Sequence, residues 1–289
     1  MNRLLLLSLL LLGGVSGCKK AETPTSPTPP SNNVLYTAIG ASDGLGIGSS
    51  VECVIFDPDC PSGRGYVYLL KRRFQADGRS PVLANVSVPG AVMSPAIQAL
   101  ARDIGRNILS TFYDQSTVVP PTTTHLTIFA GGNDVNVIAQ NVRAGRGGAD
   151  VRGFIDAQVR QWGTDLEELI RRVKARAPNA RIVALNLPNL GAAPYVATNT
   201  VQERSIVQRI AVGLTDRVNA LSAQGVIVID LMCDSRVYEA ASFSADGFHP
   251  SDRGYAFMAE LAYPALLNGS APLPSSSCSQ RTLLPVFLC

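Results

Sequence analysis

The sequence has few charged side chains, few aromatic side chains and only two histidines. Charged residues make up 16% of the chain and the formal net charge is +3, with Lys and Arg scattered along the sequence. Proteins that bind nucleic acid concentrate basic residues in one region, so this pattern argues against such a partner. Aromatic residues make up only 6%, which leaves little material for the stacking platforms of a polysaccharide groove.

Two common kinds of functional motif are also missing. No Cys-x-x-Cys pair occurs, and His125 and His249 are not spaced as ligands, so a zinc site is not expected. The chain has neither Gly-Lys-Ser/Thr nor a complete Gly-x-Gly-x-x-Gly motif. The Gly-rich turn over residues 40–48 therefore has little support as a phosphate cradle.

The cysteines fit an exported protein, in which disulfide bonds form and persist. Cys53 and Cys60 bracket a short loop and are expected to form one bond. A second bond could join Cys278 to Cys233 or to Cys289, and the sequence does not choose between these two pairings.

The first 33 residues predict export and a lipid anchor. Arg3 followed by an apolar run predicts a signal peptide over residues 1–17. Small residues directly before Cys18 resemble the lipobox of bacterial lipoproteins, in which the signal is cut before a cysteine that then carries lipid. The alternative is an ordinary secretory signal with an incidental cysteine. Residues 18–33 are expected to be the lipidated Cys18 and a disordered tether, which would hold the protein in the bacterial cell envelope, at the outer membrane or periplasmic face.

Residues 34–268 are expected to form one α/β domain, followed by an irregular tail over 269–289. Short apolar runs alternate with segments of helical periodicity, which predicts a parallel sheet covered by helices on both faces. The clearest helix is 150–177, where apolar residues recur at helical spacing. The expected strands are 34–38, 81–88, 123–130, 181–185 and 226–231, and the expected helices are 65–75, 94–109, 150–177, 200–223 and 252–267.

Residues suited to chemistry lie next to the ends of these elements. Ser42 follows the first strand, Gly90 the second and Asn133 the third, while Asp246 and His249 precede the last helix. Ligands bind at the carboxyl ends of the strands in parallel α/β sheets. These five residues are therefore expected to meet in one site.

The same residues are the parts that acyl transfer needs. A serine is a weak nucleophile until a histidine takes its proton and a carboxylate orients that histidine. Three residues apart across a turn, Asp246 can reach Nδ1 of His249 and leave Nε2 to face Ser42. The backbone N–H groups of Gly90 and Ser42 and the side-chain amide of Asn133 are suitable donors to an oxyanion.

Four blocks of the sequence resemble those of the SGNH, or GDSL-type, serine hydrolases, in the same order. The resemblance covers residues 34–267 and implies a flavodoxin-like three-layer α/β/α sandwich with a central parallel sheet. It also implies a nucleophile at Ser42, a base at His249 with its partner Asp246, and an oxyanion hole from Gly90, Asn133 and Ser42. The family works without a metal or an organic cofactor, so none is expected. The blocks are Gly40-Ala41-Ser42-Asp43, Gly90 after Asn85-Val86-Ser87-Val88-Pro89, Gly131-Gly132-Asn133-Asp134, and Asp246-Gly247-Phe248-His249-Pro250.

The first block departs from the family pattern. It reads Gly-Ala-Ser-Asp rather than Gly-Asp-Ser-Leu, so the acidic residue, Asp43, follows the serine instead of preceding it. Ser42 and the glycines remain, so activity is expected, with a substrate preference that can differ. In the second block, Pro89 lacks a donor, but Gly90 keeps its own N–H.

The expected function is hydrolysis of short- to medium-acyl esters or lipids through an acyl-enzyme, by a monomer. The alternatives are a glycan O-acetyl esterase, an acyltransferase and, from another class, a catalytically silent envelope-binding lipoprotein. The presence of all five site residues together argues against the silent protein. The expected lining of an acyl groove comprises Leu45, Ile47, Val92, Met93, Leu190 and Phe248.

Three further residues have simpler expected roles. His125 is expected to be structural or exposed rather than a second base. Asp134 is expected to cap the next helix, and Trp162 is expected to lie in the core.

Overall fold

The computed structural model describes residues 32–284, and its centre is a sheet of five strands that all run parallel. Every residue of the two strands β3 and β4 is buried, as expected for strands that helices cover on both faces. The strands, in sheet order, are β2 (Ser80–Asn85), β1 (Asn33–Ile39), β3 (His125–Phe129), β4 (Arg181–Leu185) and β5 (Ile227–Ile229).

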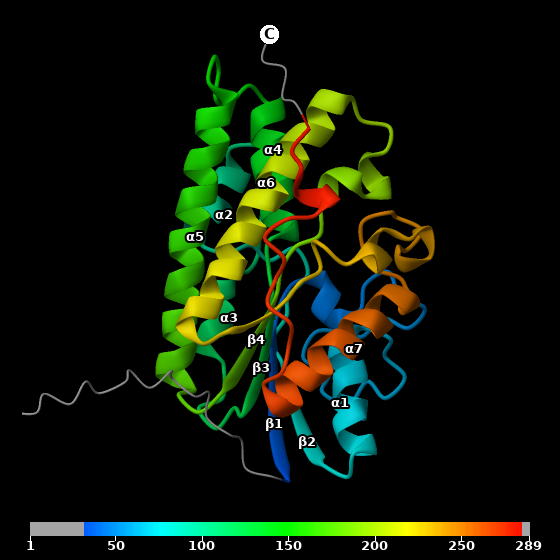
Figure 1. Cartoon of the computed structure of the whole chain (residues 1–289). Helices are drawn as coiled ribbons and strands as arrows, with labels where there is room; N and C mark the ends of the chain where they lie inside the picture. The colour runs from blue at the N-terminus through cyan, green and yellow to red at the C-terminus, as the bar shows by residue number, and fades with distance from the viewer. Residues whose placement is uncertain (1–31, 285–289) are drawn as a thin grey trace, which may run out of the picture.

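Helices cover both faces of this sheet (Figure 1). On one face α1 (Tyr66–Ala76) packs against α7 (Asp252–Asn268). The helices on the other face contact one another, which completes the three layers of the predicted α/β/α sandwich. They are α2 (Pro95–Arg102), α3 (Phe112–Thr117), α4 (Gly132–Arg143), α5 (Val151–Arg176) and α6 (Val201–Ala220).

The structure corrects several element boundaries. The helix expected over 94–109 ends as α2 at Arg102, and the chain turns at Gly105, which takes a φ of 74°. The short helix α3 is not anticipated; it begins with a capping box between Thr111 and Asp114. The helix α4 starts at Gly132, directly after Gly131 and three residues earlier than a cap at Asp134 would place its first residue.

Two disulfide bonds join cysteines of the described chain. Cys53 pairs with Cys60, as predicted, and Cys233 pairs with Cys278, one of the two pairings that the sequence left open. Cys289 lies outside the described residues. Disulfide bonds of this kind are typical of exported proteins, so this part of the predicted location is supported.

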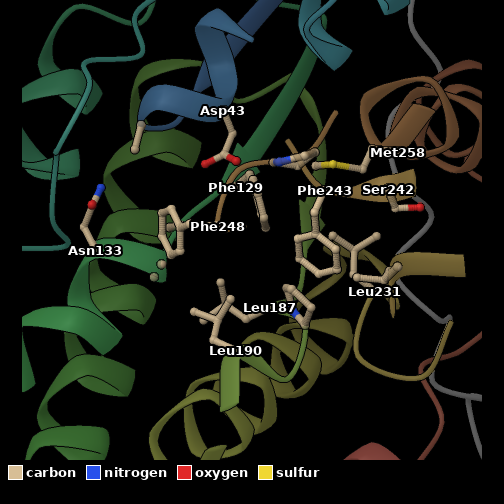
Figure 2. A pocket seen from close by; sticks show the side chains of 18 of the residues that line it. Asp43, Phe129, Asn133, Leu187, Leu190, Leu231, Ser242, Phe243, Phe248 and Met258 are labelled. Carbon is tan, nitrogen blue, oxygen red and sulfur yellow. The ribbon is translucent and has the colours of Figure 1, made fainter. Parts of the chain in front are cut away.

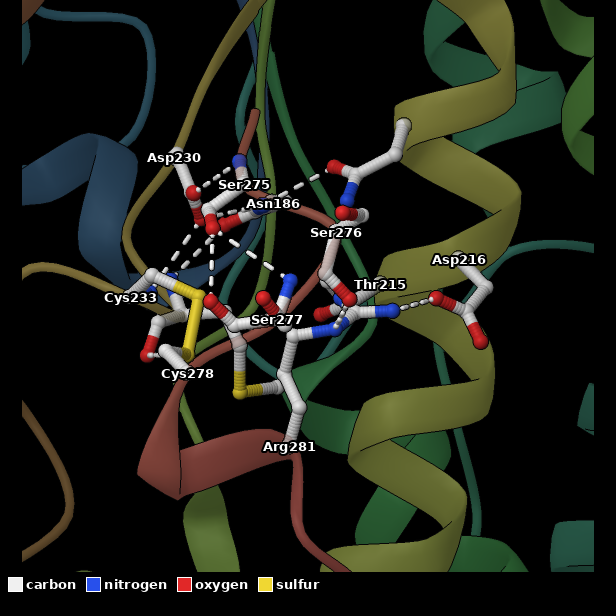
Figure 3. A network of polar contacts seen from close by, with 12 residues as sticks. Asn186, Thr215, Asp216, Asp230, Cys233, Ser275, Ser276, Ser277, Cys278 and Arg281 are labelled. Carbon is white, nitrogen blue, oxygen red and sulfur yellow. Dashed lines mark hydrogen bonds and ion pairs between the residues drawn. A yellow bond between two sulfur atoms is a disulfide. The ribbon is translucent and has the colours of Figure 1, made fainter. Parts of the chain in front are cut away.

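The segment after α7 is tied to the ends of β5 and α6 by polar contacts (Figure 3). Ser275 N donates to Oδ2 of Asp230, at 2.8 Å, and Oδ1 of Asp230 accepts from the side chain of Asn186 at 2.9 Å. Further along, Arg281 forms an ion pair with Asp216 of α6. These contacts and the Cys233–Cys278 bond hold residues 270–284, whose only regular element is the short 3-10 turn Ser279–Arg281.

Within residues 32–284, none of the helices combines the length and the apolar character needed to cross a bilayer. The predicted signal peptide, the predicted lipidation site Cys18 and nearly all of the predicted tether lie outside the described residues.

Candidate active site

Ser42, His249 and Asp246 meet above the carboxyl end of the sheet, although Ser42 and His249 are 207 residues apart in sequence. Nε2 of His249 lies 2.8 Å from Oγ of Ser42, and Nδ1 lies 2.6 Å from Oδ2 of Asp246. A carboxylate only accepts hydrogen bonds, so Nδ1 carries the ring hydrogen and Nε2 accepts from the serine hydroxyl. This arrangement can turn a serine hydroxyl into a nucleophile.

Ser42 lies in a tight turn, residues 40–46, which we call the nucleophile turn. Ser42 begins the 3-10 helix η1 (Ser42–Leu45), which Gly46 closes with a φ of 73°. Gly44 packs against Ser87, and a Cβ at Gly44 would lie only 2.1 Å from the Ser87 hydroxyl oxygen. The Gly-rich composition of this stretch is therefore needed for the close approach of the turn to the chain that follows β2.

Two side chains that the sequence analysis did not identify hold the nucleophile turn. Gln115 of α3 accepts from Gly40 N at 3.0 Å and donates to Gly40 O at 2.9 Å. Asn85, at the end of β2, donates to Gly44 O at 2.8 Å. Both side chains are buried. Nothing in the sequence distinguishes Gln115 from other polar residues, whereas Asn85 at the end of an apolar strand is a weak signal.

His249 and Asp246 lie in residues 244–250, which we call the acid–base loop, and this loop is held mainly by its own hydrogen bonds. Oδ1 of Asp246 accepts from Ser244 Oγ at 2.7 Å, Phe248 N at 2.8 Å and His249 N at 2.9 Å. Ser244 N donates to His249 O at 2.8 Å and closes the loop. Burial alone would raise the pKa of Asp246, but the hydrogen bonds from His249, Phe248 and Ser244 hold that pKa well below its usual range.

The two predicted oxyanion donors outside the nucleophile turn come from segments that contact each other. Asn133, in the first turn of α4, donates from Nδ2 to Ala91 O at 3.0 Å. Gly90 precedes that carbonyl and takes a φ of 77°, and a Cβ placed there would meet no atom within 4 Å. Open space therefore lies beside Gly90, and glycine is required by its backbone conformation.

Asp134 does not cap α4, contrary to the prediction. The N-cap position is taken by Gly131, and Asp134 lies fully buried in the first turn of the helix. Its Oδ1 accepts from Met93 N at 2.8 Å, so it fixes the segment that follows Gly90 against α4. Burial raises the pKa of Asp134 to about 7, although the bond from Met93 acts in the opposite direction.

A cavity of about 60 Å³ lies beside the triad (Figure 2). Its lining includes Ala41 and Asp43, the two neighbours of Ser42, together with Asn133 and Phe248. Most of the lining is apolar, and Asp43 carries the only charge among the described residues that line it. Figure 2 shows the Asp43 side chain at one end of this space. The other lining residues are Phe129, Ala130, Gly131, Gly132, Leu187, Pro188, Leu190, Leu231, Val237, Ser242, Phe243, Pro250, Gly254, Phe257 and Met258.

The predicted groove lining is only partly correct. Leu190 and Phe248 line the cavity. Leu45, Val92 and Met93 are buried in the core instead, and Ile47 does not line the cavity. The cavity takes most of its lining from the ends of β3, β4 and β5 and from α7. These segments are far from Ser42 in sequence, so the positions of their residues along the chain did not predict that they line the cavity.

Asp43 occupies one of the two positions at which this sequence departs from the Gly-Asp-Ser-Leu pattern; the other is Ala41. Burial raises the pKa of the Asp43 carboxyl, and the nearby His249 acts in the opposite direction. A carboxyl group therefore lies at the boundary between the triad and the apolar cavity.

The remaining predicted residues have structural positions. His125 lies at the amino end of β3, away from the triad, where its Nδ1 is 2.7 Å from Thr124 Oγ1. Burial and the neighbouring Arg181 lower its pKa to about 4. Trp162 is fully buried in the core, as predicted. Within residues 32–284, His, Cys, Asp and Glu side chains do not gather in groups of three or more that could hold a metal ion.

The sequence from residue 41 to residue 257 matches the model of the GDSL-like lipase/acylhydrolase family. No curated protein gives a significant match to the sequence. The lipase Lip_vut3 from a goat rumen metagenome is 20% identical, aligns over 78% of this chain and 94% of its own, and has a TM-score of 0.53.

Two further solved structures have similar coverage. A candidate GDSL-like lipase from Parabacteroides merdae is 18% identical over 83% of this chain and 99% of its own, with a TM-score of 0.50. A family 3 carbohydrate esterase from Clostridium thermocellum is 16% identical over 80% of this chain and 94% of its own, with a TM-score of 0.47. At these identities, the structural similarity to the two lipases supports the fold. The match to the family model supports the assignment of the chain to that family.

Proposed function

Since the chain belongs to the GDSL-like lipase/acylhydrolase family and is a carboxylic ester hydrolase, we propose that Ser42, His249 and Asp246 are its catalytic triad. The observation that supports this assignment is the continuous chain of hydrogen bonds from Ser42 Oγ through His249 to Asp246, at 2.8 Å and 2.6 Å. A serine next to a base that a third group orients is the arrangement that covalent catalysis requires.

In this mechanism Ser42 Oγ attacks the ester carbonyl carbon while its proton passes to Nε2 of His249. The imidazolium is stabilised by Asp246, whose low pKa keeps the carboxylate ionised. The proton then passes to the leaving alcohol, and an acyl group remains on Ser42. Water, activated by His249 in the same way, releases the acid and restores the serine.

The tetrahedral intermediates carry negative charge on the former carbonyl oxygen. The proposed donors to this oxygen are the backbone N–H groups of Ser42 and Gly90 and the amide of Asn133. An amide nitrogen carries two hydrogens, so Asn133 can hold Ala91 O with one and donate to substrate with the other. Each such donor is typically worth about 3 kcal/mol of barrier.

We infer that the acyl group of the substrate enters the apolar cavity beside Ser42. The cavity measures about 60 Å³, a size that favours a short to medium acyl chain over a long one. Apolar lining supports an acyl chain because it offers few partners for a sugar hydroxyl. The carboxyl of Asp43 limits how much of the lining is available to an alkyl group.

We also propose that the enzyme is exported, monomeric and anchored to the cell envelope by lipid on Cys18. The apolar run 4–12 with small residues before Cys18 supports processing at that cysteine. The two disulfide bonds support an oxidising compartment. Residues 19–33 would then connect the anchor to the folded domain.

The first test is an ester series assayed with the chain that follows Cys18 and with its Ser42→Ala variant. We expect turnover of p-nitrophenyl esters that is highest for short to medium acyl groups and falls for palmitate. In the variant, turnover should fall by about four orders of magnitude, because the nucleophile is lost.

A folded protein with no turnover above the variant on any of these esters would remove the general esterase assignment. Release of an alkyl ester, rather than the free acid, when an alcohol is added would indicate an acyltransferase. Release of acetate from acetylated glycans by the unsubstituted chain, but not by the Ser42→Ala variant, would identify a glycan esterase.

A further inference from the structure

Apolar side chains are exposed together in the loop that follows the nucleophile turn. Val51, Val54, Ile55 and Phe56 are exposed by 36%, 69%, 42% and 70%. Elsewhere in residues 32–284, the large exposed apolar side chains are well separated along the sequence, except for the adjacent Leu283 and Leu284. Single exposed apolar residues are ordinary, but a contiguous patch is typical of a binding surface. We call residues 51–56 the apolar loop.

The backbone of the apolar loop is fixed, so the exposure of its side chains is built into the fold. Cys53 N donates to Leu45 O at 2.9 Å, and the Cys53–Cys60 bond closes the loop. Arg64 N donates to Val51 O at 3.0 Å, and Tyr68 OH of α1 donates to Asp57 O at 2.9 Å. These bonds hold both ends of the loop to the folded domain, while the side chains of residues 54–56 are exposed.

The tip of the loop has an unusual backbone. Asp57 N donates to Val54 O at 3.3 Å, which closes a turn with Ile55 and Phe56 at its central positions. Phe56 takes a φ of 62°, in the left-handed region where a turn normally places Gly or Asn. Glycine at this position would relieve the backbone but remove the aromatic ring. Strained backbone of this kind is concentrated at functional sites, which favours a role for the exposed ring.

The apolar loop is attached to the same part of the protein as the acid–base loop. Ser50 donates from N and Oγ to the carboxylate of Asp252, at 2.7 Å and 2.6 Å, and Asp252 begins α7 three residues after His249. A Cβ at Gly48 would lie 2.7 Å from Cβ of His249, so the chain leading into the loop passes directly beside the catalytic histidine. Whatever the loop contacts is held near the site of ester cleavage.

The observations favour a lipid surface over a second protein as the partner. The patch is a protruding turn with four apolar side chains, whereas a specific protein interface needs about 800 Å² from each partner. The segment before β1 is long enough for membrane contact, because the residues between Cys18 and Asn33 can span up to roughly 45 Å when extended. Three acidic residues, Glu52, Asp57 and Asp59, and three basic residues, Arg64, Lys71 and Arg72, lie in or beside the loop, which suits an uncharged lipid surface. Glu52, the one charged residue within the loop, accepts from Gly48 N at 2.8 Å.

We propose that Val54, Ile55 and Phe56, with Val51, insert into the surface of a lipid bilayer and position the Ser42 site over ester bonds at that surface. This inference rests on the proposed function for the nature of the substrate, but the contact itself can be measured without catalysis.

The experiment uses the full chain with a Phe56→Trp substitution, mixed with vesicles of phosphatidylcholine that carry bromine on the acyl chains. Bromine quenches tryptophan only when the ring enters the acyl region. We expect the emission of the introduced tryptophan to fall by about half or more relative to vesicles without bromine. The natural Trp162 is fully buried, so the unsubstituted chain provides the background.

A Leu109→Trp variant is the matched control. Leu109 is 84% exposed and lies in the segment between α2 and α3, on the opposite face of the sheet from α1. We expect no bromine quenching of the tryptophan introduced in this control. Absence of quenching at position 56 on vesicles that sediment with the protein would overturn the proposal, and so would equal quenching at both positions.

Two further outcomes are decisive. If the emission of the Phe56→Trp variant shifts to the blue without vesicles, together with a concentration-dependent dimer in sedimentation velocity, the partner is a second copy and the proposal is wrong.

A triple variant V54S/I55S/F56S should lose about tenfold or more of its activity on esters embedded in vesicles and keep its activity on a dissolved short ester. An equal loss on both substrates would show that the loop supports the active site rather than lipid contact. A chain that cleaves no ester but shows quenching would contradict only the proposed function.

Discussion

Ser42 and His249 come from two segments that are held in place differently. The nucleophile turn depends on side chains from distant elements, since Gln115 bonds to Gly40 and Asn85 bonds to Gly44. In the acid–base loop, by contrast, the carboxylate of Asp246 accepts hydrogen bonds from within residues 244–250. One segment is shaped by tertiary structure and the other by local structure.

Because of this difference, the positions of the two segments should be sensitive to substitutions in different parts of the chain. The acid–base loop can keep its shape as long as Asp246 is present, because one carboxylate bonds to three groups of the loop and to the histidine ring. The nucleophile turn has no comparable local centre. Its position should therefore respond to changes in α3 and β2, far from it in sequence.

Among the variants that compare the two segments, the largest effect should follow from Asp246→Asn, which removes the centre of the acid–base loop. Asparagine donates where the carboxylate accepted, so the ring hydrogen of His249 moves to Nε2 and the histidine can no longer take the serine proton. We expect kcat/KM to fall by about 10³- to 10⁴-fold. The measurement is steady-state kinetics on a short p-nitrophenyl ester.

Ser244→Ala is the matched control for that variant, because it removes one bond to Asp246 Oδ1 and keeps the carboxylate. Its loss should be only a few-fold. If Asp246→Asn lost less than about tenfold, the orienting role of Asp246 would have to be abandoned.

The same difference explains how much the sequence could predict. The Asp246 and His249 pairing was predictable, because three residues across a turn fix the distance between the two side chains. The alternation of apolar strands and helices was enough to predict a parallel sheet and the edge of that sheet at which the site lies. These are local patterns, and Ser42 could be assigned to the same edge because it follows a strand.

Contacts made by residues far apart in sequence could not be predicted. Gln115 lies in α3, a helix of six residues that carries no clear periodicity, and its bonds to Gly40 span 75 residues. Asp134 is predicted to cap a helix, but it lies inside the first turn of α4 and its carboxylate accepts from Met93 N. Propensity and spacing contain no information about such contacts.

An intermediate effect should follow from Gln115→Met, which tests the distant support of the nucleophile turn. The substitution leaves Gly40 N and Gly40 O buried without their partner, which should cost about 2–4 kcal/mol in the free energy of unfolding. The turn should also shift from its catalytic position, so we expect kcat to fall by about tenfold to a hundredfold with little change in KM. Urea denaturation and steady-state kinetics measure the two quantities.

Gln98→Met provides the control, since Gln98 also bonds from a helix to a backbone carbonyl, Ile108 O at 2.7 Å. It should lower stability without changing kcat. Equal effects of the two variants on kcat would mean that Gln115 acts only through general stability.

The smallest effect concerns the two aspartates, one in each half of the site, and it should differ in sign. Burial raises the pKa of Asp43, so the folded chain binds a proton more readily there than the unfolded chain does. The charged carboxylate therefore lowers stability at neutral pH, and this cost disappears as the pH falls below about 4, where the group becomes neutral in both states. Asp43→Asn should raise Tm at pH 7 by about 2–4 °C, and the gain should vanish in acid.

Asp246 has a pKa below its usual range, so its carboxylate adds stability above the pKa of the unfolded chain. That contribution is lost as the pH falls towards its low native pKa. Asp246→Asn should therefore lower Tm at pH 7, and the deficit should shrink in acid. Thermal unfolding of both variants from pH 3 to pH 8 makes the comparison. Changes in Tm of the same sign for the two variants, or changes that do not depend on pH, would contradict the prediction that the charged carboxylate lowers stability at Asp43 and raises it at Asp246.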